Sequence, residues 1–277
     1  MATGAEPQPF VAGELPVLRG EAGGKGPPIV LCHGLTATRR SVIHGSRALE
    51  RAGHRVVLYD ARGHGESDPA AAGQGYDYPA LVADLEVVLD SQVDTGRVVA
   101  GGHSMGAHTA IAYALRNPAR VAGLVVIGPS YTGVEEAGSL EYWDGLADAL
   151  SREGVDGFVA YIDRNQRTDP AWRDSVLRFT RERMLRHRDL DAVARALREI
   201  SRSRPFETLE DLRAIEAPTL VVASHDAADP GHPYAVAAAY AEQLPNAELV
   251  SEEEGQSPLA WQGGRLSRAI AAFAARL

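Results

Sequence analysis

The stretch that decides the fold of this chain is Gly102-His103-Ser104-Met105-Gly106. It follows the apolar run 97–101 and precedes the helix-like run 107–115. A Gly-x-Ser-x-Gly sequence between a strand and a helix is typical of a nucleophile elbow, in which the glycines permit a sharp turn that holds the serine oxygen clear of the backbone. The pattern therefore predicts Ser104 as a nucleophile at the end of a buried strand.

The composition is that of an ordinary globular protein, with 277 residues of which 45% are hydrophobic and 23% charged. A chain of this length can bury a large core, as one domain or as a domain with an insertion. The formal net charge of −9 argues against a nucleic-acid or anionic-membrane partner. Arginine supplies nearly all of the positive charge, with Lys25 the only lysine, which fits a GC-rich bacterial genome or a heat-adapted protein. The composition therefore fits a bacterial protein without a nucleic-acid or membrane partner.

Three features of the sequence predict a cytoplasmic location. Cys32 is the only cysteine, which excludes an intrachain disulfide and fits a reducing compartment. Residues 1–13 contain no basic segment followed by an apolar core, so we expect no signal peptide. The chain contains no run of about 18 apolar residues, so we expect no transmembrane helix.

Short apolar runs alternate with helical patterns along most of the chain. Continuous hydrophobicity within a run, as opposed to alternation, predicts strands that are covered by helices on both faces. Strand–helix alternation predicts an α/β fold with a mostly parallel sheet and right-handed crossovers. The predicted strands are residues 29–32, 55–59, 98–101, 121–127, 218–223 and 247–250.

The alternation stops between residues 132 and 213, where the sequence is rich in charge and helical in pattern. Trp172, Val176 and Phe179 recur at helical spacing there and predict one apolar helix face. We interpret this stretch as a helical cap, or lid, inserted between two strands. The predicted organisation is an α/β core of residues 1–131 and 214–277 with a cap of residues 132–213.

Three segments that each follow a predicted strand resemble those of the α/β-hydrolase superfamily. They are Cys32-His33-Gly34-Leu35-Thr36-Ala37, Asp60-Ala61-Arg62-Gly63-His64-Gly65-Glu66-Ser67 and the elbow at 102–106. The resemblance runs from about residue 27 to the C-terminus and favours the branch of esterases, lipases and C–C-bond hydrolases that carry a helical cap. It implies the α/β-hydrolase fold and hydrolysis of a carboxylic ester or related acyl substrate, with no cofactor.

The resemblance also implies the roles of three residues around the elbow. Ser104 takes the place of the nucleophile. The oxyanion hole uses the backbone N–H of the following residue, Met105, and a second N–H from the loop after His-Gly, at Leu35. Losing one such donor typically costs about 10²–10³ in rate. The histidines of the three motifs, His103 among them, are expected to be structural.

The acid of the family follows the strand at 218–223, and Asp226 stands at that place. A carboxylate there orients an imidazole and stabilises the imidazolium that forms. Asp229 is the second candidate, with the alternative role of capping the turn before Pro230 or the helix that follows.

The histidine of the family belongs in the loop after the last strand, but residues 251–264 contain none. Gln256 occupies the histidine's place, between Gly255 and Ser257-Pro258. A glutamine amide can bond both Asp226 and Ser104, but it cannot accept a proton at neutral pH. The sequence therefore predicts a serine without its usual base.

Three explanations of Gln256 remain open. The histidine has been replaced in this particular chain, or the natural protein has lost it, or another histidine serves as the base. His232 is the best alternative base because it lies in the loop after the strand at 218–223. This loop also carries Asp226 and Asp229, and we call it the acid loop. We expect a loop rearrangement to be needed to bring His232 over Ser104. The acidic run 252–254 is another possible source of a base, but such runs usually form a solvated edge.

A rival hypothesis is non-catalytic, with the pocket under the cap binding a small apolar ligand for sensing or signalling.

The sequence indicates no metal site, because it contains no H-x-x-x-H or H-E-x-x-H pair.

Overall fold

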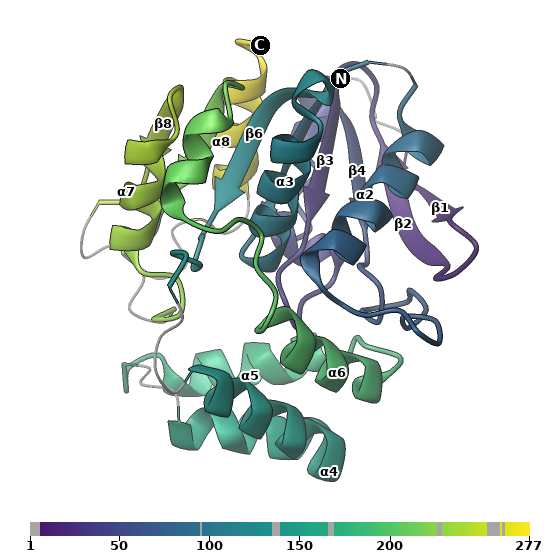
Figure 1. The fold of residues 1–277 in the computed structure, drawn as a ribbon, viewed down its shortest axis with the longest axis vertical. Helices are drawn as coiled ribbons and strands as arrows, with labels where there is room; N and C mark the ends of the chain where they lie inside the picture. The colour runs from purple at the N-terminus through teal and green to yellow at the C-terminus, as the bar shows by residue number, and fades with distance from the viewer. Residues whose placement is uncertain are drawn as a thin grey trace.

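The computed structural model describes residues 6–94, 96–134, 139–165, 169–225, 229–253, 261 and 264–277. Its centre is an eight-stranded sheet of order β1-β2-β4-β3-β5-β6-β7-β8 (Figure 1). The pairs from β4 through β8 are parallel, and β1 and β2 add an antiparallel edge. The strands are β1 Gln8–Ala12, β2 Leu18–Gly23, β3 Pro28–Cys32, β4 Arg55–Tyr59, β5 Val98–His103, β6 Val121–Ile127, β7 Thr219–Val222 and β8 Ala247–Val250.

The structure confirms the predicted mostly parallel α/β fold, and all six predicted strands are present as β3 to β8. The hairpin β1–β2 was not predicted. β1 is largely exposed, and β2 reads Leu-Arg-Gly-Glu-Ala-Gly, so neither strand carries the continuous apolar run typical of a central strand.

Helices cover both faces of the sheet, and β3 shows how its side chains divide between them. Val30 and Cys32 pack in one cluster with α2, α3 and α7, whereas Ile29 and Leu31 pack in another with α1 and α8. This division follows from the two-residue period of a strand. These helices are α1 Ala48–Arg51, α2 Tyr78–Gln92, α3 Met105–Arg116, α7 Tyr234–Gln243 and α8 Gly264–Ala274, with short 3-10 helices at Arg39–Ile43, Pro118–Arg120 and Leu209–Ala214.

Three further helices form a layer beyond the carboxyl ends of the parallel strands (Figure 1). They are α4 Ser139–Asn165, α5 Arg173–Met184 and α6 Leu190–Ile200. They share an apolar cluster of their own, which includes Leu146, Phe158 and Leu197. Near the end of the range predicted as the cap, Phe206 and Leu212 pack into the main core cluster.

The apolar face predicted for α5 is not its buried face. Phe179 is 44% exposed, and the buried residues of this helix are Thr180 and Met184. Spacing alone predicted a helix here but not the side of it that packs.

Among the described helices, none has the length and apolar character that crossing a membrane requires.

We expect Gly106→Ala to destabilise the fold by about 3 kcal/mol or more. A methyl group on Gly106 would lie 2.1 Å from the carbonyl oxygen of Cys32, so α3 would have to move away from β3. Urea unfolding measures the loss. Gly231→Ala is the matched control, because its added methyl meets no atom closer than 3.8 Å. Equal stability of the two variants would contradict the close packing of α3 on β3.

Candidate active site

Ser104 lies at the sharp turn between β5 and α3 and adopts φ 52° and ψ −117°. Positive φ is uncommon for a residue with a side chain, and such strain is concentrated at functional sites. The Ser104 N–H donates to the carbonyl oxygen of Ile127 at 3.0 Å, which fixes the turn against the end of β6. The local geometry is thus that of the predicted nucleophile elbow.

The loop after β3, which carries Leu35, runs directly against this turn. A methyl group on Gly34 would lie 2.9 Å from His103 Nδ1 and 3.6 Å from Ser104 Cβ. The Leu35 side chain packs against both the cap cluster and the neighbouring cluster that contains Met105. The two residues predicted to supply oxyanion donors therefore lie beside the serine and under the cap.

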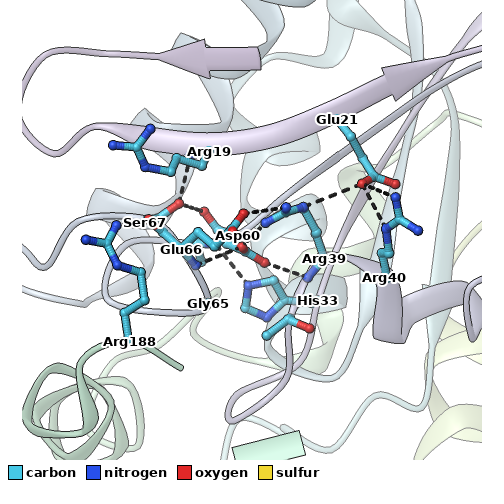
Figure 2. Close-up of polar contacts among 12 residues, drawn as sticks. Arg19, Glu21, His33, Arg39, Arg40, Asp60, Gly65, Glu66, Ser67 and Arg188 are labelled. Atoms are coloured by element: carbon cyan, nitrogen blue, oxygen red, sulfur yellow. Dashed lines mark hydrogen bonds and ion pairs between the residues drawn. The ribbon is translucent and has the colours of Figure 1, made fainter. Parts of the chain in front are cut away.

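A buried ring and a buried carboxylate brace this loop against the loop after β4. His33 accepts the Ala61 N–H on Nε2 at 2.9 Å, and its Nδ1–H donates to the carbonyl oxygen of Gly34 at 2.8 Å. Asp60, which is fully buried, accepts the Arg39 backbone N–H at 2.7 Å and pairs with the Arg39 guanidinium (Figure 2). The loop of Leu35 is therefore held in place by the body of the protein.

The cap is fastened to the same loops by His187, which follows α5. Its Nδ1 accepts the Gly65 N–H at 2.9 Å, and its Nε2–H donates to the carbonyl oxygen of Thr36 at 3.0 Å. Both bonds require the neutral ring. Burial lowers the pKa of His187 to about 4, so the ring is neutral at pH 7. Sequence reasoning did not find this residue, since nothing local to position 187 indicates contact with residues 36 and 65.

A second group of polar side chains gathers where β5 and the acid loop meet. His232 Nδ1 lies 2.9 and 2.8 Å from the two carboxylate oxygens of Asp229. The His232 ring packs edge-on against His103, with 4.7 Å between ring centroids. A methyl group on Gly128 would lie 3.2 Å from His103 Nε2 and 3.4 Å from His232 Cγ. The structure thus places His232 against the residue that precedes Ser104.

Burial and neighbouring charges set the ionisation of this group. Burial, reinforced by His232, lowers the pKa of His103 to about 3, so its ring is neutral. Burial alone would raise the pKa of Asp229, but His232, His103 and Arg183 outweigh it and lower that pKa to about 2. Arg183, on cap helix α5, has an Nε that is buried without a hydrogen-bond partner among the described residues. Burial lowers the pKa of Arg183, an effect that Asp229 opposes.

His103, Asp229 and His232 also form a set of three groups of the kind that binds metal ions. One ligand-type atom from each lies within 4.8 Å of the others. They come from two distant segments, which is why no sequence motif indicated them. Two imidazoles and a carboxylate suit a divalent transition metal, but the positive charge of Arg183 nearby opposes a cation.

Asp226 and Gln256 lie outside the described residues. The segment that carries Gln256 has a described residue on either side, Glu252 and Trp261. The carboxylate of Glu252 accepts the Ser224 hydroxyl at 2.7 Å and the His225 N–H at 2.6 Å. Trp261 Nε1–H donates to Glu252 at 3.1 Å and also to the carbonyl oxygen of Ala223.

These bonds correct the interpretation as a solvated edge at Glu252, which is 4% exposed. Its carboxylate joins the acid loop to the segment that follows β8. No sequence signal distinguished Glu252 from its two acidic neighbours.

Three buried histidines predict that the fold loses stability in mild acid. Burial lowers the pKa of His103 and His108 to about 3 and that of His187 to about 4. Histidine in an unfolded chain titrates near pH 6.5. Between that pH and about 4 the unfolded chain therefore binds more protons than the folded chain does. The stability from neutral rings is therefore complete above pH 6.5 and falls with pH, by about 1.4 kcal/mol per unit for each ring.

Urea unfolding at pH 7, 6 and 5 measures this loss. His108→Gln is the informative variant, because His108 Nε2 accepts the N–H groups of Ser130 and Tyr131, both at 3.3 Å. This variant should be less stable than the parent at pH 7. Its free energy of unfolding should also fall less steeply with falling pH, by about 1.4 kcal/mol per pH unit. A parent protein equally stable at pH 7 and pH 5 would contradict the prediction.

Comparison with known proteins matches residues 27–261 to the α/β hydrolase fold family. The 2-hydroxy-6-oxononadienedioate/2-hydroxy-6-oxononatrienedioate hydrolase of Cupriavidus pinatubonensis is 31% identical over 234 residues, which cover 80% of this chain and 77% of that protein. Epoxide hydrolase B of Mycobacterium tuberculosis is 38% identical over 109 residues, 39% of this chain and 30% of that protein.

As with the epoxide hydrolase, this chain spans less than two thirds of the length of two other curated relatives. It covers 66% of one of them and 48% of the other. Among solved structures, a thermophilic esterase from Thermogutta terrifontis superposes with a TM-score of 0.77 at 23% identity, covering 98% of this chain and 99% of that one. The family match spans most of the sheet, the turn at Ser104 and helices α4 to α6, and the chain belongs to the α/β-hydrolase fold family.

Proposed function

We propose that this protein is a serine hydrolase that acts on a carboxylic ester or a related acyl compound. The observation that carries the proposal is the strained backbone of Ser104 at the start of α3, with the loop of Leu35 packed against it. Hydrolysis of an acyl group needs a nucleophile and fixed donors for the oxygen that becomes negative. Relatives named as hydrolases and a structural neighbour named as an esterase support the same class of reaction.

In the proposed reaction, Ser104 Oγ attacks the carbonyl carbon of the substrate. The carbonyl oxygen gains a negative charge, which the N–H groups of Leu35 and Met105 stabilise. Because His33 and Asp60 hold the loop of Leu35, these donors need little rearrangement as the charge develops. The cap, fastened by His187, excludes water from the acyl group.

A second candidate function is the binding of a small apolar ligand without catalysis. The observation that favours it is Gln256 at the place of the family's histidine. A glutamine cannot activate Ser104, so a scaffold that depended on that position would bind its ligand and leave it intact.

A fluorophosphonate probe distinguishes the two functions, because it forms a covalent bond only with an activated serine. We expect the probe to label the chain once, with the added mass on the peptide that contains Ser104. We also expect Ser104-dependent release of p-nitrophenol from short acyl esters. A folded chain that is neither labelled nor active on such esters would support the ligand-binding function instead.

A further inference from the structure

We propose that Asp229 and His232 form the base that activates Ser104, in place of the histidine that the chain does not carry at position 256. The inference rests on the proposed hydrolase function and names the group that completes it. In this arrangement the acid and the imidazole come from one short loop, three residues apart, and Gln256 is not required to move a proton.

The hydrogen bond between the two side chains fixes the ring in the form that a base needs. Since the Asp229 carboxylate only accepts, the proton of neutral His232 lies on Nδ1 and is donated to it. The lone pair then lies on Nε2, which has no hydrogen bond to any described residue. His232 keeps 19% of its side-chain surface exposed, so a reacting group can approach the ring.

The position of the ring beside the elbow supports the same role. His232 packs on His103, which precedes Ser104, and its Cγ lies against Gly128. Gly128 follows Ile127, whose carbonyl oxygen accepts the Ser104 N–H. The dyad therefore borders the turn from the side of β6, whereas the loop of Leu35 borders it from the side of β3.

The other histidines of the site are less suited to act as a base. His33 and His187 use both ring nitrogens in hydrogen bonds to the backbone. His108 uses Nε2 for two backbone N–H groups and Nδ1 for Tyr78. The His103 ring has no hydrogen bond to a carboxylate among the described residues. Within the described part of the chain, His232 is the only histidine whose ring is hydrogen-bonded to a carboxylate.

The proton balance of the step is complete with these groups. As Ser104 Oγ bonds to the acyl carbon, its proton passes to His232 Nε2, and the Asp229 carboxylate stabilises the imidazolium. The imidazolium returns the proton to the leaving alkoxide as the ester C–O bond breaks. Water then adds to the acyl-enzyme, gives one proton to Nε2, and the carboxylic acid leaves as the proton returns to Ser104.

His232→Gln tests the proposal, with His225→Gln as the matched control. His225 lies in the same region of the chain, and its ring stacks on Tyr234. We expect His232→Gln to lower both the rate of fluorophosphonate labelling and kcat/KM for p-nitrophenyl acetate by about 10²-fold or more. The control should stay within about twofold of the parent, and circular dichroism and thermal unfolding should show both variants folded.

His232→Ala with added imidazole separates proton transfer from a structural role. Free imidazole should restore part of the labelling rate in this variant and should have no effect on Ser104→Ala. Asp229→Asn should also slow labelling, because an amide no longer stabilises the imidazolium; the analogous change in a serine protease costs about 10⁴ in kcat. Activity that survives in His232→Gln at the parent's rate overturns the dyad.

Two outcomes separate failure of the dyad from failure of the proposed function. Ser104 that is labelled equally in the parent and in His232→Gln leaves a serine hydrolase with a different base. A parent that is not labelled at all overturns both. If EDTA abolishes the activity and zinc restores it, the group of His103, Asp229 and His232 binds a metal, and the dyad is again overturned.

Discussion

Replacing Ser104 with alanine is expected to abolish fluorophosphonate labelling and to lower kcat/KM for p-nitrophenyl esters by about 10³-fold or more. In a serine protease with its full triad, loss of the nucleophile costs about 2 × 10⁶ in kcat. The loss expected here is smaller because Gln256 stands in the usual place of the base. The oxyanion donors of Leu35 and Met105 remain in the variant, so hydrolysis need not fall to the rate in water alone.

The variant should keep the stability of the parent, which makes the result a test of chemistry and not of folding. Alanine retains the positive φ of this position and its N–H bond to Ile127. Ser151→Ala, on the exposed surface of α4, is the control and should retain the full rate. A Ser104→Ala protein that hydrolyses the esters as fast as the parent would exclude Ser104 as the nucleophile.

Sequence reasoning predicted the elements whose pattern depends on their own residues. Strands β3 to β7 are mostly buried, so each shows largely as a continuous apolar run in the sequence, whereas the edge strand β8 is only partly buried. Helix α2 begins after Asp77, and the Asp77 carboxylate caps it locally by accepting the Ala80 N–H at 2.9 Å. The hairpin β1–β2 and the buried side of α5 were not predicted, because both depend on what the rest of the fold packs against them.

The same distinction applies to the site. The Gly-x-Ser-x-Gly spacing is local, and it predicted a sharp turn at Ser104. The contact of His232 with His103 joins segments more than 120 residues apart, and no spacing rule indicates it. Glu252 was taken for a solvated residue because its partners, Ser224 and Trp261, become neighbours only when β7 and β8 pair in the sheet.

Gln256→His is expected to give the largest gain of any single substitution, about 10²-fold or more in Ser104-dependent hydrolysis of small acyl esters. The sequence on both sides of position 256, Gly255 and Ser257-Pro258, keeps the form of the family. The described residues that flank this segment, Glu252 and Trp261, are both bonded to the acid loop. A histidine introduced at 256 is therefore expected to lie close to Ser104 and to the carboxylates of the acid loop.

The pH profile and a double variant decide whether the new histidine is the base. The gain should increase as pH rises through about 6–7, where an imidazole loses its proton, and Ser104→Ala should remove it. His232→Gln should then have little effect, because the introduced base no longer needs the Asp229–His232 dyad, whereas in the parent chain the same change is costly. A folded Gln256→His protein with no Ser104-dependent gain on a broad panel of esters would mean that the site differs from an acyl hydrolase in more than its base, and ligand binding would become the better hypothesis.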